Sequence, residues 1–274
     1  MTDVRLYRGN HRVGAIDPLD RGLAYGDGVF ETMRMHAGHV HWWPLHRQRL
    51  LLGVERLGLP LPDMAMLDSE IATVASQSGN GVLKLLLTRG GGGRGYAPPV
   101  AAEAAWQLST HPLPVPAPSV DVAWCTLRIA EQPALAGIKH CNRLEQVLAR
   151  REVAGLGADE GLLCDAADAL VGATSANVMV LQQGKWSTPP VDRHGIAGVC
   201  RRVLLESGLV LERTIPRADV EAADAVFLCN AVRGILPVRS LGTRRFADTA
   251  ALRPVREALR SIHPAFQHDP EETA

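Results

Sequence analysis

Apolar positions along the first 110 residues follow two different spacings. Where they alternate with polar residues, they are typical of strands with one buried face, and where they recur every three or four residues, they form one stripe of a helix. The pairs Gly9-Asn10 and Ala37-Gly38 fit hairpin turns between strands. The pattern predicts strands at residues 4–7, 11–13, 29–35, 40–43, 82–88 and 104–108, and helices that begin near Pro44 and at residue 63, the second running to residue 78.

Four prolines at alternate positions mark the segment HPLPVPAPS, residues 111–119. Alternating proline favours an extended, semi-rigid connector over a helix or a central strand. We therefore expect a small N-terminal domain (1–110), a linker (111–119) and a larger C-terminal domain (120–274). In the larger domain the pattern predicts strands at 120–125, 161–164, 177–181 and 225–229 and helices at 142–154, 198–206 and 249–262.

The composition is that of a globular chain with balanced charge. Of 274 residues 46% are hydrophobic, and basic and acidic residues number 29 each. This balance argues against a dedicated surface for nucleic acid or anionic membrane. No apolar stretch is long enough for a membrane span, and the first residues lack the hydrophobic region of a signal peptide. We expect a cytoplasmic protein.

Cysteine and histidine do not form metal-ligand patterns. The five cysteines stand at 125, 141, 164, 200 and 229, without a CxxC pair, and the ten histidines include no HExxH motif. A disulfide framework or a metal site is therefore not expected. His39 and His41 can share one face of a strand, and with Trp42 and Trp43 they form a cluster that fits an interface between two copies of the chain.

Lysine is scarce, because arginine supplies 26 of the 29 basic residues. Lys84 lies inside an apolar run and Lys185 in a turn, whereas Lys139 lies between the apolar segment 133–138 and a helical pattern. Desolvation disfavours an ammonium group, so an amine beside a buried site can become the neutral nucleophile of Schiff-base chemistry. From position alone, a solvated lysine beside a helix is the better explanation of Lys139.

Four segments, in this chain order, change that interpretation. DRGLAYGDGVFETMR (20–34) resembles the signature of the fold-type IV pyridoxal-phosphate enzymes, and HRQRL (46–50) resembles their phosphate-arginine segment. TRGGGGRGY (88–96) and GIKHCNRLEQVLAR (137–150) resemble the substrate loop and the active-lysine segment of the 4-amino-4-deoxychorismate lyase branch. The resemblance implies an α+β fold of two domains, a small α+β N-terminal domain and a larger β-barrel-like C-terminal domain with helices.

The resemblance also assigns roles to residues. Lys139 would carry pyridoxal 5'-phosphate and act as the catalytic base, and the Arg49 guanidinium would bind the phosphate. For Arg49 alone, a solvated helix arginine would be the simpler explanation. The remaining phosphate contacts implied are the amides of Val199 and Cys200, at the start of a helix, and Asn230 and Ala231. The substrate contacts implied are Thr32, Arg94 and Asn142.

One position departs from the family pattern. These enzymes commonly place a glutamate against the pyridine nitrogen, five residues before an asparagine that here is Asn177. That position is Gly172 in this chain. The nearest acids, Asp165 and Asp168, are expected in a turn between strands. Without an acid at the ring nitrogen the cofactor withdraws electrons less strongly, which disfavours transamination more than an elimination that forms an aromatic ring.

The resemblance implies a homodimeric lyase that converts 4-amino-4-deoxychorismate to 4-aminobenzoate and pyruvate for folate biosynthesis. Two alternatives stay open on the sequence. One is a D-amino-acid or branched-chain aminotransferase of the same fold, which residues 20–34 do not exclude. The other is a diverged, non-catalytic protein of this fold, for which Gly172 is the only support.

Overall fold

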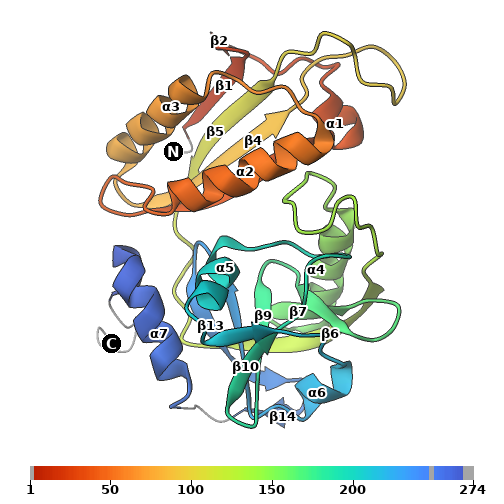
Figure 1. Ribbon diagram of the computed structural model, residues 1–274, viewed down its shortest axis with the longest axis vertical. Helices are drawn as coiled ribbons and strands as arrows, with labels where there is room; N and C mark the ends of the chain where they lie inside the picture. Colours follow the sequence, from red (N-terminus) through yellow and green to blue (C-terminus); the bar gives the residue numbers. More distant parts are fainter. Residues whose placement is uncertain (1–2, 247–249, 268–274) are drawn as a thin grey trace. The chain divides into compact units, whose positions relative to one another are not determined.

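Figure 1 shows a computed structural model of the chain, which describes residues 3–246 and 250–267. Contacts between Cα atoms divide the chain into two compact units. Unit 1 comprises Met1–Leu113 together with Ile138–Asn142, and unit 2 comprises Pro114–Gly137 and Arg143–Ala274. Five residues from the middle of the chain therefore belong with the N-terminal unit.

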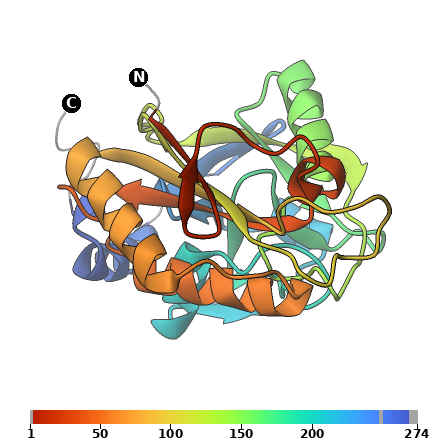
Figure 2. The same ribbon diagram turned by 90° about the horizontal axis from the view of Figure 1, so that it is seen from above.

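Unit 1 contains a five-stranded antiparallel sheet in the order β2-β1-β5-β4-β3. Helices α2 and α3 cover one face of this sheet (Figures 1 and 2), and their apolar stripes share a core with the inward-facing positions of the strands. The Asp63 carboxylate begins α3 by accepting from the amide of Ala65 at 2.8 Å. The elements are β1 Val4–Arg8, β2 His11–Val13, α1 Arg21–Tyr25, β3 Gly28–Met35, α2 Trp43–Leu57, α3 Met64–Ser78, β4 Gly81–Thr88 and β5 Ala105–His111.

The expected strand at residues 40–43 is wrong. After β3 the chain forms only an isolated bridge between His36 and His39, and α2 begins at Trp43. The cause is burial, because Trp42 is 6% exposed and the Nε1 of Trp43 donates to Asp68 at 2.9 Å. The two tryptophans thus serve the unit's own core and do not form the aromatic surface that we expected. The rings of His39 and His41 do lie together, 5.8 Å apart.

Unit 2 contains a nine-stranded mixed sheet in the order β11-β10-β9-β12-β13-β6-β7-β8, with β14 paired to β13. Most of its strands are buried, as their continuous apolar runs indicate. The strands are β6 Val120–Arg128, β7 Glu160–Cys164, β8 Leu170–Ala173, β9 Asn177–Gln182, β10 Lys185–Thr188, β11 Val210–Glu212, β12 Ala225–Asn230, β13 Gly234–Leu241 and β14 Arg244–Arg245. The helices are α4 Leu144–Leu156, α5 Val199–Glu206, α6 Arg217–Glu221 and α7 Leu252–Ile262, followed by the 3-10 turn Pro264–Phe266.

The expected α+β fold class is confirmed, and most expected helices and strands are present with shifted ends. Helix α4 begins at Leu144 and not at Asn142, because Asn142 belongs to unit 1. Thr249, the expected first residue of the last helix, lies outside the described residues. Within the part of the chain that is described, no helix has both the length and the apolar character needed to cross a membrane.

Candidate functional site

Lys139 lies on the outer edge of the unit 1 sheet. Its carbonyl accepts from the amide of Phe30 at 2.9 Å, and the amide of Cys141 donates to the carbonyl of Gly28 at 2.9 Å. These bonds add residues 138–142 beside β3, and Ile138 is fully buried there. The Lys139 amine lies 4.2 Å from the centroid of the Phe30 ring. Backbone hydrogen bonds thus join the segment of Lys139 to β3, which lies largely within the signature segment 20–34.

Glu31, which neighbours Phe30 on β3, is the centre of a buried ion cluster. Its side chain is 1% exposed and accepts from His46 Nδ1 at 2.6 Å and from Arg49 Nε at 2.8 Å. A second contact joins Arg49 Nη2 to the other carboxylate oxygen. Burial alone would raise the pKa of Glu31, but the charges of Arg49 and His46 outweigh it and lower this pKa to about 2. Glu31 therefore stays ionised and fixes the direction of the Arg49 guanidinium.

His46, the second partner of Glu31, has a lowered pKa. Burial lowers its pKa below the usual value, the Glu31 carboxylate opposes this, and the positive charges of Arg49 and Lys139 lower it further. We assign the proton to Nδ1, which then donates to Glu31. In the sequence only Arg49 of this helix was singled out. His46 and Arg49 lie three residues apart, so they share one face of the helix, and with an acid on a neighbouring strand they give a recognisable signal for an ion cluster.

A second amine meets the same aromatic ring. Lys84 Nζ lies 5.6 Å from the Phe30 centroid, and the register of β3 and β4 places Thr32 opposite Lys84. In the sequence Lys84 stood out only as an interruption of an apolar run. The structure explains the interruption, because the side chain of Lys84 is directed to the partly exposed face of the sheet that also carries Phe30 and Thr32.

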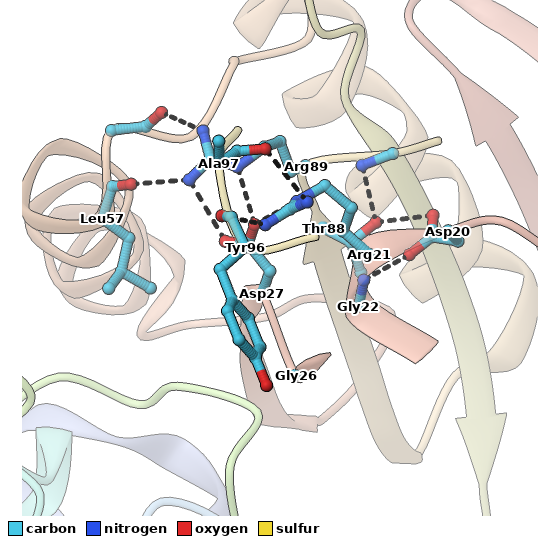
Figure 3. Close-up of polar contacts among 12 residues, drawn as sticks. Asp20, Arg21, Gly22, Gly26, Asp27, Leu57, Thr88, Arg89, Tyr96 and Ala97 are labelled. Carbon is cyan, nitrogen blue, oxygen red and sulfur yellow. Dashed lines mark hydrogen bonds and ion pairs between the residues drawn. The ribbon is translucent and has the colours of Figure 1, made fainter. Parts of the chain in front are cut away.

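The glycine-rich loop is held by charged residues that the sequence did not single out (Figure 3). Arg21 donates to the carbonyls of Gly95, Tyr96 and Ala97, and its Nε donates to Asp27 at 2.9 Å. Asp27 also binds Arg89. A cavity of about 270 Å³ in unit 1 is lined by Arg21, Tyr25, Gly26, Asp27, Leu57, Arg89, Tyr96, Pro98 and Asn142.

Two of the predicted substrate contacts lie in this region. Arg94 is exposed on the loop and has no hydrogen bond or ion pair among the described residues. Asn142 lines the cavity, and its Nδ2 donates to the carbonyl of Gly26 at 3.1 Å. Gly26 has a φ of 66°, and a Cβ there would come within 2.6 Å of Asn142 Oδ1, so only glycine fits this contact.

In unit 2, helix α5 presents its N-terminus through a glycine cap. Gly198 precedes Val199 and Cys200, and the first amides of a helix have no partner within it. A Cβ on Gly198 would lie 2.0 Å from Asn177 Oδ1, while Nδ2 of the same side chain donates to the carbonyl of Ile196 at 3.0 Å. Asn177 therefore requires a glycine here and fixes the start of the helix, whose free amides and dipole are of the kind that suits an anion.

The third predicted phosphate segment lies beside the second. The Cys229 thiol donates to Met179 Sδ at 3.7 Å, and the proximity of Cys229 to Cys200, followed by burial, raises the pKa of Cys200 well above its usual value. Asn230 comes next in the chain, and its Oδ1 accepts from the amides of Val232 and Arg233 at 3.0 and 2.8 Å. The Asn230 side chain thus holds the turn, so a ligand here would be met by backbone groups of Asn230 and Ala231.

Position 172 offers no side-chain carboxylate, but a Cβ there would make only an ordinary contact. Gly172 lies in β8 opposite Leu163, and a Cβ on it would meet only the carbonyl of Ala176 at 3.4 Å. The expected turn at Asp165 and Asp168 is confirmed, because Asp165 Oδ1 accepts from the amides of Ala167 and Ala169 at 2.9 Å.

Glu131, Asp165 and His194 place donor atoms within 4.8 Å of one another in unit 2. Each already has a protein partner. Glu131 pairs with Arg193 at 2.7 Å, and His194 Nε2 lies 3.4 Å from Asp165 Oδ2. We assign no metal to this group.

Comparison with known proteins agrees with this geometry. Residues 28–241 match the sequence profile of the amino-transferase class IV family. An aminodeoxychorismate lyase from Vibrio harveyi is 33% identical over 235 residues, which cover 81% of this chain and 86% of that protein. A D-alanine aminotransferase from Bacillus licheniformis is 29% identical over 239 residues, 83% of each chain.

Among solved structures, the crystal structure of a 4-amino-4-deoxychorismate lyase from Pseudomonas aeruginosa matches with a TM-score of 0.87 and 40% identity, and covers 93% of this chain and 98% of that one. The resemblance noted in the sequence is therefore confirmed over nearly the whole chain. By its profile match, its relatives and its fold, the chain belongs to the amino-transferase class IV family.

Proposed function

We propose that this chain is an aminodeoxychorismate lyase that uses pyridoxal phosphate and converts 4-amino-4-deoxychorismate to 4-aminobenzoate and pyruvate for folate biosynthesis. The observation that carries the proposal is the position of Lys139: its segment is bonded to β3, and its amine lies over Phe30, the residue that precedes Glu31 in the chain. Two lyases, at 33% and 40% identity, are more similar to the chain than the D-alanine aminotransferase at 29%.

The residues present fit pyridoxal phosphate in their chemistry. Unit 1 provides an amine, Lys139, for an aldehyde and a guanidinium, Arg49, for a phosphate. Unit 2 provides the helix start at Val199 and Cys200 and the turn at Asn230 and Ala231, both suited to an anion. When bound, the cofactor supplies electron withdrawal from the substrate carbon that bears the amine.

Lys139 Nζ moves the proton in the reaction that we propose. It takes the proton from the ring carbon that bears the substrate amine and returns a proton to the enolpyruvyl group as the carbon–oxygen bond breaks. The products are 4-aminobenzoate and pyruvate, and one amine serves first as base and then as acid. The aromatic product favours this elimination even though Gly172 provides no acid for the ring nitrogen.

The substrate carries two carboxylates, and unit 1 offers exposed or partly exposed cations to receive them. Arg94 is exposed on the glycine-rich loop, and Lys84 lies beside Phe30 and opposite Thr32. We assign the carboxylates to Arg94 and Lys84, and we assign Thr32 and Asn142 to the orientation of the ring. An arginine can hold a carboxylate by two hydrogen bonds, whereas lysine acts as a point charge.

The direct test is incubation of the purified holoenzyme with enzymatically generated aminodeoxychorismate. We expect 4-aminobenzoate and pyruvate in equal amounts, and slow or absent transamination of D-alanine and L-leucine. Transamination without 4-aminobenzoate would instead support the aminotransferase alternative. A protein that neither reacts nor develops violet absorbance with pyridoxal phosphate would support the non-catalytic alternative.

We also propose a homodimer. The face of α4 that carries Leu144, Val147 and Leu148 leaves these side chains 75%, 60% and 46% exposed, which is a contiguous apolar surface of the kind that interfaces cover. Light scattering at micromolar concentration is expected to give twice the chain mass, and a species of only 29.5 kDa would contradict this.

We place the protein in the cytoplasm. The five cysteines are all free thiols, four of them buried, which suits a reducing compartment. Fractionation of cells that produce the protein is expected to recover it with the soluble cytoplasmic marker enzymes.

A further inference from the structure

The loop that carries Arg94 contains five glycines, at positions 90–93 and 95, so its own side chains hold it weakly. Its order comes from Arg21, at the start of α1. Arg21 Nη1 donates to the carbonyl of Gly95 at 2.9 Å and Nη2 to that of Tyr96 at 2.8 Å. Three consecutive carbonyls, including that of Ala97 at 3.4 Å, thus face one guanidinium (Figure 3).

Arg21 is itself fixed by Asp27. The Nε of Arg21 donates to Asp27 at 2.9 Å, and its side chain is 5% exposed. The same carboxylate accepts from Arg89 at 2.7 and 3.1 Å. We call these three residues the Asp27 cluster. Its two cations and one anion are partly or wholly buried, so each hydrogen bond within it is charge-assisted and strongly directional.

Arg89 connects the cluster to helix α2. It donates to the carbonyls of Leu57 and Gly58 at 2.8 and 2.6 Å, at the C-terminal end of the helix. The same helix carries Arg49, the proposed phosphate ligand. The Asp27 cluster therefore links the glycine-rich loop to the element that positions the cofactor.

Arg21, Arg89 and Arg94 differ in how many of their N–H donors are already used in hydrogen bonds within the protein. A guanidinium has five N–H donors, and Arg21 and Arg89 each make four hydrogen bonds to protein oxygens. Little of either is left for a ligand. Arg94, by contrast, is exposed and has no hydrogen bond or ion pair among the described residues.

We propose that Arg21 is a positioning residue for substrate binding: through the Asp27 cluster it holds residues 92–98 so that Arg94 can receive a substrate carboxylate. The proposal rests on the proposed function, because that function assigns the carboxylate to Arg94. Tyr96 is positioned by the same bonds, and its ring lies 5.5 Å from that of Tyr25 at the cavity described above. A loop ordered before the substrate arrives spares the substrate the cost of ordering it.

The first test compares Arg21→Gln with the wild-type holoenzyme in steady-state kinetics. We expect KM for aminodeoxychorismate to rise at least about tenfold, since several charge-assisted bonds are lost, while kcat and the visible spectrum of the bound cofactor change little. The matched control is Arg5→Gln, which removes another largely buried, ion-paired arginine of unit 1, one that binds Glu70. The control is expected to leave KM unchanged, and a rise in KM equal to that of Arg21→Gln would overturn the proposal.

A conservative variant and a double variant test whether Arg21 acts through Arg94. Arg21→Lys keeps the charge but not the planar donors, so it is expected to restore only part of the affinity. Combined with Arg94→Gln, the Arg21→Gln change is expected to raise KM much less than it does alone. An undiminished effect in the Arg94→Gln background would show that Arg21 does not act through Arg94 and would overturn the proposal.

The closing experiment needs no substrate. Proteases cleave a loop faster when it opens more often, so trypsin is expected to cut after Arg94 faster in Arg21→Gln and Asp27→Asn than in the wild-type protein and the Arg5→Gln control. Equal rates of nicking would overturn the role of the Asp27 cluster even if the lyase reaction is confirmed. If the variants are nicked faster but the wild-type protein has no lyase activity, the role of the Asp27 cluster in holding the loop is supported. The proposed function is then contradicted, and with it the assignment of the substrate carboxylate to Arg94.

Discussion

The two units hold their candidate cofactor-binding groups in place by different means. Unit 1 offers two charged side chains: Arg49, which is held by a buried ion pair with Glu31, and Lys139, whose segment is held by backbone hydrogen bonds to β3. Unit 2 offers backbone amides at the start of α5 and in the turn after β12, and their positions depend on the absence of a side chain at Gly198 and on the amide of Asn177. The groups of unit 1 are therefore expected to respond to changes of charge and pH. Those of unit 2 are expected to respond to small changes of side-chain volume.

The largest expected effect comes from unit 1. Lys139→Ala removes the attachment point for the cofactor and the group that moves the proton, so we expect lyase turnover to fall by more than about 10⁴-fold, the upper limit for an acid–base group alone. Lys185→Ala, at the start of β10, is the control and should be unaffected. Borohydride reduction and peptide mapping of the wild-type holoenzyme should label Lys139. A label on Lys84 or Lys185 would contradict the assignment.

Glu31→Gln should test the ion cluster that supports Arg49. Removing one partner of a buried ion pair costs about 3–5 kcal/mol of unfolding free energy, whereas an exposed pair contributes about 0–1 kcal/mol. The control is Glu70→Gln, whose side chain is 27% exposed, and it should cost much less. Urea unfolding at neutral pH measures both. Equal losses in the two variants would contradict the importance that we assign to burial.

The same variant has a pH signature with a defined sign. The pKa of Glu31 is lowered from 4.5 to about 2 in the folded protein. The stability that its carboxylate contributes is therefore fully present above about pH 5, just above the unfolded-state pKa, and is lost as the pH falls through the folded-state value. The difference in unfolding free energy between wild type and Glu31→Gln should shrink between pH 7 and pH 3.5, and a constant difference would contradict the assignment.

In unit 2 the expected effects are smaller and depend on volume. Gly198→Ala places a Cβ against Asn177 and should cost about 1–3 kcal/mol, as overpacking does. If the helix start shifts to make room, cofactor affinity should fall about tenfold for each 1.4 kcal/mol that acts on the anion site. Gly155→Ala, in α4 of the same unit, is the control, because nothing lies within 4 Å of a Cβ there. Cofactor titration measures both, and an equal loss in the control would count against this account.

The smallest effect concerns the type of reaction. Gly172→Glu should increase transamination of D-alanine more than it increases lyase turnover, because a carboxylate at the ring nitrogen strengthens electron withdrawal. Gly172→Gln, of the same size but uncharged, should not do so. Brisk transamination by the unmodified protein, or an equal gain in the glutamine variant, would show that Gly172 does not set the reaction.

The spacing of apolar residues and the helix-capping residues correctly predicted the elements whose structure depends on their own sequence. The continuous apolar run of β4 and the Asp63 cap of α3 are such cases. Residues 40–43 show the limit, since the alternating His39 and His41 suggested a strand, but burial of Trp42 decided for a helix. The choice between these outcomes depended on a core that the local pattern does not contain.

The candidate site shows the same division. Lys139, Arg49 and Arg94 were found by resemblance of short segments. Arg21 stayed unnoticed although it lies inside one of those segments, because its function depends on carbonyls 74 to 76 residues away in the chain. Contacts to backbone carbonyls leave no pattern of side chains that a sequence alone can reveal.

The return of residues 138–142 to β3 has a consequence for the order of folding. Until these residues have been synthesised, β3 remains an edge strand with unpaired backbone groups, and such edges recruit other chains. The N-terminal unit is therefore incomplete as a contiguous fragment, because the chain that closes its edge emerges from the ribosome only after residue 137. A fragment that ends at Leu113 should aggregate more readily than the full chain, and a version that supplies Ile138–Asn142 through a short linker should restore its solubility.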